Sequence, residues 1–346
     1  MKKITKTLLV MLMTSVFSFS TVTAGELSVT GGVTATWGMG EDSSGLGVSN
    51  ELDFNASGEL DNGITWKWQT QLDDAGTVND DTSLVLGTSF GNVALMISEG
   101  GLASKYGYGV GAMGPGSDYS STSSVLHGIN IDSYNNVQYH TPAGLLPFGL
   151  TAKVAYAPNL SDAQGASAKS KGTVETNAVG ADASHYRVDA SPIDGLSIGA
   201  DYAVANGGAN ERYKQESAGA YAKYVTGPIT IGFSRSGYQP FEAKGAANTV
   251  GAVSYETDSY GIMFAVNENL TVSYSEENST KRTSSVLGVT STRTAAVERE
   301  MQMQHIQAAY TIGGATLGVA INDTDNDGYT AGKQSKQTIF SLAIAF

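Results

Sequence analysis

The chain has 346 residues, a net charge of −13 at neutral pH and no cysteine. The acidic balance argues against a nucleic-acid-binding protein, and a chain without cysteine cannot depend on disulfides for its fold. Only 15% of the residues are charged, whereas the 42 glycines and 17 tyrosines are typical of strands and turns. One domain built from β-strands is therefore expected.

The first 24 residues predict a secretory signal peptide. Lys2, Lys3 and Lys6 precede an apolar stretch over 8–19, and Val22-Thr23-Ala24 is a small-residue cleavage site. The apolar stretch is shorter than the roughly 18 to 20 residues that a helical span needs. No other run in the sequence approaches that length.

Cleavage is expected to leave a mature chain of residues 25–346. Removal of the three lysines takes the net charge from −13 to −16. Intact-mass spectrometry of the protein isolated from cells should place its first residue at Gly25. A mass that matches a cut more than a few residues away would contradict this prediction.

From residue 27 onwards, apolar and polar residues alternate with a period of two. In the first stretch Leu27, Val29 and Trp37 share one face, and Ser28 and Thr30 share the other. This pattern predicts strands with one apolar and one polar face. The predicted strands lie at 27–37, 51–60, 64–72, 82–90, 93–99, 131–140, 147–156, 184–191, 196–204, 217–225, 229–236, 248–266, 270–276, 298–312, 315–322 and 335–346.

The last stretch indicates a transmembrane antiparallel β-barrel. Phe340, Leu342, Ile344 and Phe346 fall on one face and small or polar residues on the other, as a wall between lipid and an aqueous lumen requires. A soluble sandwich would also show such alternation in one strand. However, a soluble protein of this length would need continuous apolar runs for its core. Here nearly every apolar stretch is interrupted at every second position, which favours the barrel.

Two stretches, 248–266 and 298–312, are longer than one membrane crossing, and their apolar parity changes midway. In the first, odd-numbered Tyr255 is followed by even-numbered Tyr260; in the second, Met303 is followed by even-numbered apolar residues. Because an extra residue flips every later side chain, each is predicted to be one strand with a bulge. The total is then sixteen strands, with eighteen as the alternative even count.

The connections between these strands alternate in length. The short ones are 61–63, 91–92, 142–147, 191–195, 226–228, 267–269 and 313–314. The long ones are 38–49, 73–81, 100–130, 157–183, 205–216, 237–247, 277–297 and 323–334. This arrangement predicts short periplasmic turns, long external loops and both termini on the short-turn side.

Three segments and the final Phe346 resemble a known family. The segments are Asn136–Pro142 with Gly144 behind it, Phe264–Leu270 and Tyr310–Ala315. They are similar to segments of the Gram-negative general porins, in particular the alphaproteobacterial branch of the sixteen-stranded trimeric kind. The resemblance implies a water-filled pore for passive diffusion of small hydrophilic solutes and ions. It also implies a homotrimer in the outer membrane, surrounded by lipid and lipopolysaccharide and inserted by the outer-membrane assembly machinery.

The resemblance further implies that the longest connection, 100–130, folds into the barrel as a constriction. Such loops are usually acidic, whereas this one carries only Asp118, with Glu99 at its edge. It is rich in glycine, serine and tyrosine, so strong charge filtering is not expected. Tyr106 and Tyr108 are predicted to narrow the passage sterically.

Inward parity assigns further residues to the lumen wall. Together with the loop residues, the predicted pore lining is Lys67, Gln69, Glu99, Tyr106, Tyr108, Asp118, Lys153, Arg187 and Lys223. Inward carboxylates are Glu51, Asp53, Asp189 and Asp201. Charges more than about 10 Å from the narrowest point are largely screened at 0.1 M salt. A weak cation preference is therefore expected.

Two other functions remain as alternatives. An enzyme is not predicted, because His127, His140, His185 and His305 stand in no recognisable metal or nucleophile spacing. A non-conducting barrel, adhesin-like or purely structural, would have a lumen plugged by apolar side chains. The polar residues at inward positions favour water instead.

One motif goes beyond pore lining. Asp323-Thr324-Asp325-Asn326-Asp327-Gly328 has the spacing of a calcium loop, and Gln334 stands where an EF-hand has its bidentate glutamate. Asp and Asn also favour tight turns without any ion. The sequence leaves open a Ca²⁺ site at Asp323, Asp325 and Asp327 or an ion-free turn, and no other cofactor is expected.

Overall fold

The computed structural model describes residues 25–40, 44–72, 80–103, 129–158, 160, 182–206, 211–240, 242–243, 250–287, 292–293 and 297–346. The predicted signal peptide and most of the 100–130 connection lie outside the described residues. In the part that is described, no helix is long and apolar enough to cross a membrane.

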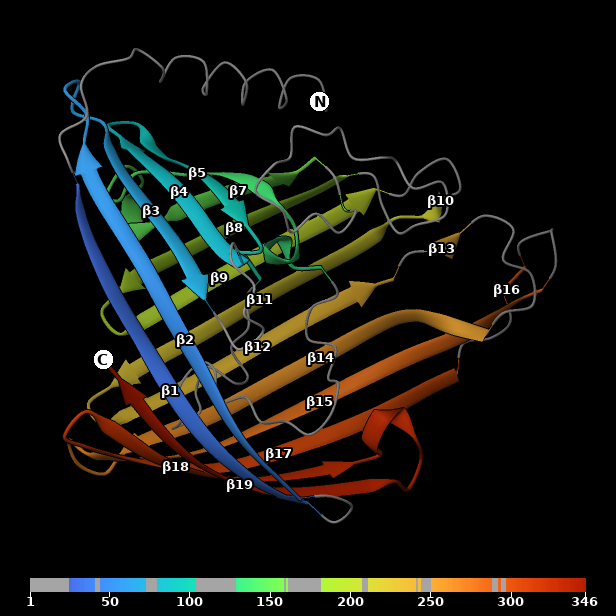
Figure 1. The fold of residues 1–346 in the computed structure, drawn as a ribbon. Coiled ribbons are helices and arrows are strands. Elements are labelled where there is room, and N and C mark those ends of the chain that lie inside the picture. Colours follow the sequence, from blue (N-terminus) through green and yellow to red (C-terminus); the bar gives the residue numbers. More distant parts are fainter. Residues whose placement is uncertain are drawn as a thin grey trace.

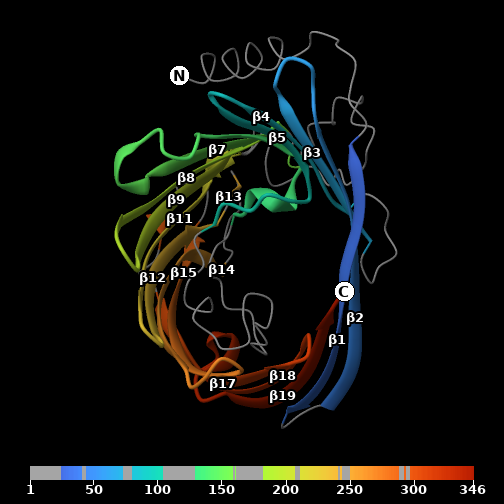
Figure 2. The ribbon, with the colours of Figure 1, turned by 90° about the vertical axis from the view of Figure 1, so that its left-hand side faces the viewer.

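Sixteen antiparallel strands form one closed barrel (Figure 1, Figure 2), which confirms the predicted count. They are β1 (Glu26–Gly40), β2 (Ser44–Glu59), β3 (Thr65–Leu72), β4 (Asp80–Thr88), β5 (Gly91–Ile97), β6 (Asn136–His140), β7 (Thr151–Ala157), β8 (Asp182–Ile193), β9 (Leu196–Asn206), β11 (Gln215–Thr226), β12 (Ile229–Gln239), β14 (Val250–Ala265), β15 (Leu270–Leu287), β17 (Val297–Ile312), β18 (Ala315–Asp325) and β19 (Gln334–Ala345).

Short elements complete the described fold. The strands β10 (Glu211–Tyr213) and β13 (Glu242–Ala243) pair with each other, and β16 (Thr292–Arg293) pairs with the end of β15. Three 3₁₀ turns are η2 (Ile131–Ser133), η3 (Pro147–Gly149) and η4 (Asp327–Tyr329).

The barrel closes between the first and last strands. β1 pairs with β19 from Gly32 opposite Ala345 to Gly40 opposite Gln337, and with β2 on its other edge. The backbone N–H of Phe346 donates to the carbonyl of Gly31 at 2.9 Å, and the N–H of Gly31 donates to the carbonyl of Phe346 at the same distance. No edge is left unpaired at the seam, as a wall in lipid requires.

The predicted faces are confirmed along the wall. The large apolar side chains of Leu27, Trp37, Phe264 and Phe340 are exposed on the outside. Hydroxyl side chains follow the inner face of β12, β14 and β15, where Ser234, Ser236, Thr257, Ser259, Ser273 and Ser275 lie. An apolar outer face and a polar inner face are the pattern of a transmembrane barrel.

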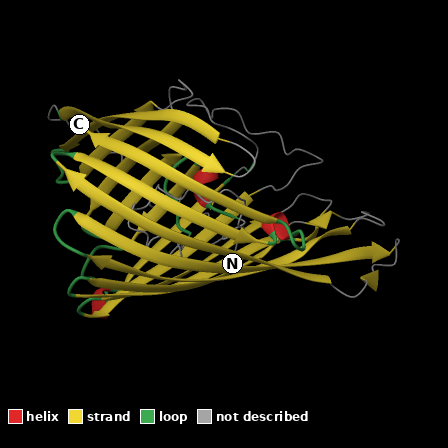
Figure 3. Ribbon diagram, turned by 90° about the horizontal axis from the view of Figure 1, so that it is seen from below, coloured by secondary structure: helices red, strands yellow, loops and turns green. Residues whose placement is uncertain are grey.

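The short connections gather at one end of the barrel (Figure 3). Glycines supply the left-handed backbone that these turns need: Gly63 has φ 79°, and Gly313 and Gly314 have φ 57° and 85°. We call this end the short-turn end and the opposite one the long-loop end. Both β1 and β19 have their terminal residues at the short-turn end, as predicted.

At the long-loop end several strands run further than predicted. The connections expected at 38–49 and 277–297 are largely ladder, because β1 continues to Gly40, β2 begins at Ser44 and β15 reaches Leu287. A tilted crossing uses only about 9 to 11 residues. The extension of β15, from Glu277 to Arg282, is polar on both faces and carries no apolar alternation. In β2 the alternation does continue, because Leu46 and Val48 are exposed on the outer face between small residues.

Both long stretches form one strand each, as predicted, but a bulge explains neither parity change. The pairing of β14 with β15 does shift between Ala252 and Ser254, before Tyr255. From Ser254 to Ala265 the pairing is continuous, so Tyr255 faces the lumen while Tyr260 faces outward. The register of β17 is continuous against both neighbours. Its parity change arises because Met301 and Met303 are apolar residues of the inner face. Both are completely buried, and η4 packs against the same strand.

Candidate functional site inside the barrel

The chain leaves the wall after β5 and turns into the lumen. Ser98 and Gly100 have φ 52° and 81°, and the chain returns to the wall only at Asn136. The described ends of this connection, 98–103 and 129–135, lie inside the ring, where Figure 2 shows the green coil of η2. A Cβ on Gly100 would come within 2.4 Å of the side-chain nitrogen of Gln138, so the close approach requires glycine.

An apolar cluster docks both ends of the connection on one side of the lumen. Leu102, Ile129 and Ile131 are almost fully buried against small side chains of β7, β8 and β9, which are Ala155, Ala157, Ala183, Ala203 and Ala205. Burial of each large side chain contributes roughly 1.5 to 3 kcal/mol. Alanine at these inward positions leaves room for the connection between wall and lumen.

Two amide side chains of β6 hold the backbone of the same connection. The Nδ2 of Asn136 donates to the carbonyls of Glu99 and Ile131 at 3.1 and 3.2 Å. The Nε2 of Gln138 donates to the carbonyl of Gly100 at 2.6 Å. Sequence reasoning took both residues as strand and family-segment residues and missed their anchoring role.

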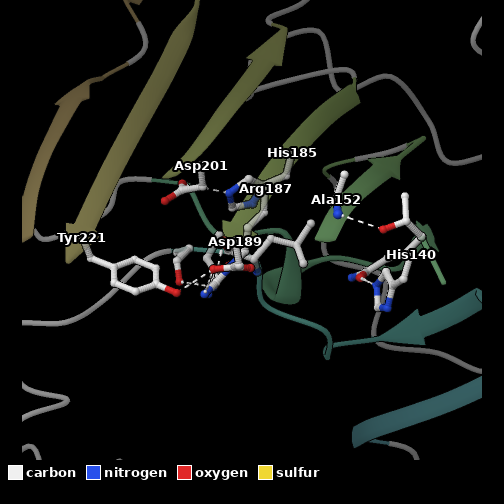
Figure 4. Close-up of polar contacts among 12 residues, drawn as sticks. His140, Ala152, His185, Arg187, Asp189, Asp201 and Tyr221 are labelled. Carbon is white, nitrogen blue, oxygen red and sulfur yellow. Dashed lines mark hydrogen bonds and ion pairs between the residues drawn. The ribbon is translucent and has the colours of Figure 1, made fainter. Parts of the chain in front are cut away.

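Arg187 is the third anchor (Figure 4). Its Nε and Nη2 donate to the two carboxylate oxygens of Asp189 at 2.7 and 2.9 Å, and the hydroxyl of Tyr221 donates to the same carboxylate at 2.7 Å. Its Nη1 donates to the carbonyls of Leu102 and Ala103 at 3.4 and 3.1 Å. Arg187 therefore points inward as predicted, but its charge is paired with Asp189 and used to hold the connection.

Two of the inward histidines, His140 and His185, form side-chain hydrogen bonds. The Nε2 of His185 is 3.0 Å from Oδ2 of Asp201, and both side chains are completely buried (Figure 4). The Nε2 of His140 is 2.7 Å from Oε1 of Gln138. Both histidines lie on the inner face of the wall, because Tyr139 and Tyr186, the residues next to them, have outward parity.

The remaining predicted pore-lining residues divide into two groups. Lys67, Gln69, Lys153 and Lys223 lie at inward positions of the wall, consistent with parity. Gln69 donates to Asp53 at 3.2 Å, and Lys153 stands directly opposite Arg187 in the register. Tyr106, Tyr108 and Asp118 lie outside the described residues.

Glu99 lies where the connection enters the lumen. Burial raises the pKa of its carboxyl group above 4.5, and the nearby carboxylates of Asp81, Asp132 and Asp53 raise it further. Its negative charge is therefore lost at a higher pH than that of an ordinary glutamate.

The carboxylates of the calcium-like motif do not converge. Asp323 forms an ion pair with Lys336 at 2.9 Å, and Asp325 accepts a hydrogen bond from Gln334 at 2.9 Å. Asp327 is buried and pairs with Lys333 at 2.8 Å. No group of three possible metal-binding side chains occurs among the residues that the structure describes. The motif continues β18 and then forms a turn.

Two carboxylates of β14 and β15, Glu256 and Glu276, lie on the outer face. Glu256 has the same parity as Tyr260 and Phe264, which are exposed on the outer face of β14. Glu276 has the same parity as Val272, which is exposed on the outer face of β15. Sequence analysis did not assign these positions. The net charge of the chain is therefore a poor guide to the charge of the lumen.

No protein-family model matches the sequence, and a search of curated proteins finds no match. Solved outer-membrane proteins share the fold at low identity. OmpT of Vibrio cholerae is 11% identical over 94% of this chain and 98% of its own, with a TM-score of 0.64. The anion-selective porin from Comamonas acidovorans is 13% identical over 93% of this chain and 100% of its own, also at 0.64.

OmpF of Salmonella typhi is 11% identical over 93% of this chain and 98% of its own, with a TM-score of 0.60. A trimer form of OmpT is 13% identical over 94% of this chain and 100% of its own, also at 0.60. Each likeness covers the whole barrel. By architecture, therefore, this chain shares the porin-like barrel fold of these outer-membrane proteins.

Proposed function

We propose that the protein is an outer-membrane porin, a water-filled channel for passive diffusion of small hydrophilic solutes and ions. The observation that carries the proposal is the inner face of the closed wall. It bears hydroxyl, amide and charged side chains, and the ends of the longest connection dock on one side of it. A transmembrane barrel with a polar interior conducts unless that interior is plugged.

The 100–130 connection is proposed to form the constriction. Its two described ends are fixed to the β7–β9 wall by an apolar cluster and by the amides of Asn136 and Gln138. Because both ends are held inside the barrel, the segment between them starts and finishes in the lumen. A fixed loop there would set the size limit for solutes.

A homotrimer is also part of the proposal. The strands β5, β6 and β7 have only 7, 5 and 7 residues, whereas a tilted membrane crossing uses about 9 to 11. This side of the wall is too short to meet the full thickness of the hydrocarbon layer. Contact with a neighbouring copy would cover it, and one of the solved relatives in fold is itself a trimer form.

Single-channel recording of the purified protein in a planar bilayer tests the proposal. Stepwise conductance that increases with salt concentration is the expected result. A silent bilayer containing correctly folded barrels would contradict the porin and favour the non-conducting alternative. Release of fatty acid from the lipid would instead indicate an enzyme.

Ion selectivity should be weak and cationic at low salt, and it should fade as salt rises. The reversal potential in a tenfold salt gradient measures it, with the double variant Asp118→Asn and Glu99→Gln as the comparison. Because the pKa of Glu99 is raised, the preference should also decline on acidification before ordinary carboxylates titrate. An anion-selective parent, or a double variant with unchanged selectivity at low salt, would show that these carboxylates are not the filter.

A further inference from the structure

A row of four inward-facing side chains crosses four neighbouring strands near the long-loop end. In the register of the wall, Tyr238 of β12 stands opposite Tyr255 of β14. Tyr255 stands opposite Lys281 of β15, and Lys281 stands opposite Arg299 of β17. We call these four residues the cross-strand row. The proposed porin function assigns no role to them.

The parity of each strand fixes the direction of the row. Tyr260, Ile262 and Phe264 are exposed on the outside of β14, so odd-numbered Tyr255 faces the lumen. Lys281 stands opposite Tyr255, and Arg299 stands opposite Lys281, so both cations lie on the same face of the wall as Tyr255. The row therefore lies on the inner wall, where a solute passing through the channel can reach it.

Three tyrosine rings meet at the row. The rings of Tyr238 and Tyr255 are stacked, with centroids 5.8 Å apart and planes 19° from parallel. Tyr329, carried inward by η4, lies 5.7 Å from Tyr255 and shares a hydrogen bond of 2.8 Å with Ser279. The Nζ of Lys281 lies 5.7 and 5.4 Å from the ring centres of Tyr255 and Tyr329. These rings hold the ammonium group in place.

The two cations of the row lack carboxylate partners in the described part of the chain. The ammonium of Lys281 lies over the two rings, and Nη1 of Arg299 donates to the backbone carbonyl of Glu298 at 3.4 Å. The carboxylates of Glu256 and Glu298 instead face outward, where they bind Arg282.

Like charges directly opposite each other on neighbouring strands destabilise a sheet. Lys281 and Arg299 occupy such a pair on the inner face. An anion bound between them would relieve the repulsion. A planar carboxylate suits the guanidinium fork of Arg299 and the point charge of Lys281. An aromatic ring attached to that carboxylate would find tyrosine faces beside it.

We propose that the cross-strand row binds aromatic carboxylates at the long-loop entrance of the channel. The carboxylate lies between Lys281 and Arg299, and the ring packs on the tyrosine cluster formed by Tyr238, Tyr255 and Tyr329. The proposal rests on the proposed channel function for its purpose, which is to concentrate one class of solute at the entrance. The binding itself depends only on the folded barrel.

Calorimetric titration of the detergent-folded protein with benzoate tests the site, with acetate and cyclohexanecarboxylate as comparison ligands. Benzoate should bind at least about tenfold more tightly than either, which corresponds to about 1.4 kcal/mol of binding free energy. Lys281→Gln and Tyr255→Leu should each weaken benzoate binding about tenfold. The matched control is Arg282→Gln, because Arg282 is the next residue on the same strand and faces outward. Its affinity should be unchanged.

Three results would each overturn the site. The folded parent could fail to bind benzoate, or it could bind benzoate and cyclohexanecarboxylate equally well. Lys281→Gln and Arg282→Gln could also lose the same amount of benzoate affinity. Conductance in potassium chloride alone is recorded on the same preparation. A conducting channel without benzoate binding would refute the site and leave the porin in place. A silent channel with intact benzoate binding would refute the porin and leave the site.

Discussion

Deletion of Phe346 should reduce the amount of assembled barrel by more than tenfold. Phe346 makes the last pair of backbone hydrogen bonds across the seam, both with Gly31 at 2.9 Å. Its ring lies so close to Gly31 that a Cβ there would come within 3.1 Å of it. Loss of this residue opens the seam at the short-turn end, where unpaired backbone groups in an apolar medium cost several kcal/mol each.

The fraction of heat-resistant, unboiled protein on a denaturing gel measures assembly. Phe346→Ala keeps the backbone pair and removes only the ring, so an intermediate loss is expected. Phe340→Ala is the matched control, because Phe340 is an exposed outward aromatic on the same strand. Normal assembly of the deletion variant would contradict the role of the seam.

The strand count and the two faces of the wall could be predicted because lipid enforces them. Every second residue of a crossing must be apolar, so Phe340, Leu342 and Ile344 reveal the outer face of β19 without any knowledge of its neighbours. Turn chemistry added the hairpins, since Gly313-Gly314 supplies the left-handed backbone that a two-residue turn needs. These signals are local, and sequence reasoning detects local signals.

Where lipid no longer acts, the same reasoning failed. β15 continues beyond residue 276 through Glu277–Arg282, a stretch with polar residues on both faces. Met301 and Met303 look like outward residues in the sequence because they are apolar. They lie on the inner face instead, where η4 packs against β17. A parity change can therefore arise without a bulge, from a covered patch of the lumen. Only the pairing partners distinguish the two causes.

The docking of the long connection could be predicted in part. Inward parity placed Arg187 correctly, but its hydrogen bonds to Leu102 and Ala103 join segments more than eighty residues apart. One local signal did exist. Ala155, Ala157, Ala183, Ala203 and Ala205 occupy inward positions of three strands where polar residues were expected. A run of alanines on a lumen face indicates that something packs there.

Replacement of Arg187 by alanine should raise the single-channel conductance and strengthen the cation preference. The carbonyls of Leu102 and Ala103 lose their guanidinium donor, and two hydrogen bonds to a charged group are worth on the order of 3 kcal/mol or more. The end of the connection is then held less firmly against the wall. The carboxylate of Asp189 also loses its bidentate partner and becomes a net negative charge in the lumen.

Lys153→Ala separates these two effects. Lys153 stands directly opposite Arg187 on the neighbouring strand, so its loss removes the same charge from the same part of the wall. It makes no hydrogen bond to the connection among the described residues, so the constriction should stay in place. We therefore expect its reversal potential to shift in the cation direction while its conductance in molar salt, where wall charges are screened, remains that of the parent. Arg187→Ala should differ from the parent in both measurements. Equal molar-salt conductance in the two variants and the parent would mean that Arg187 does not hold the constriction.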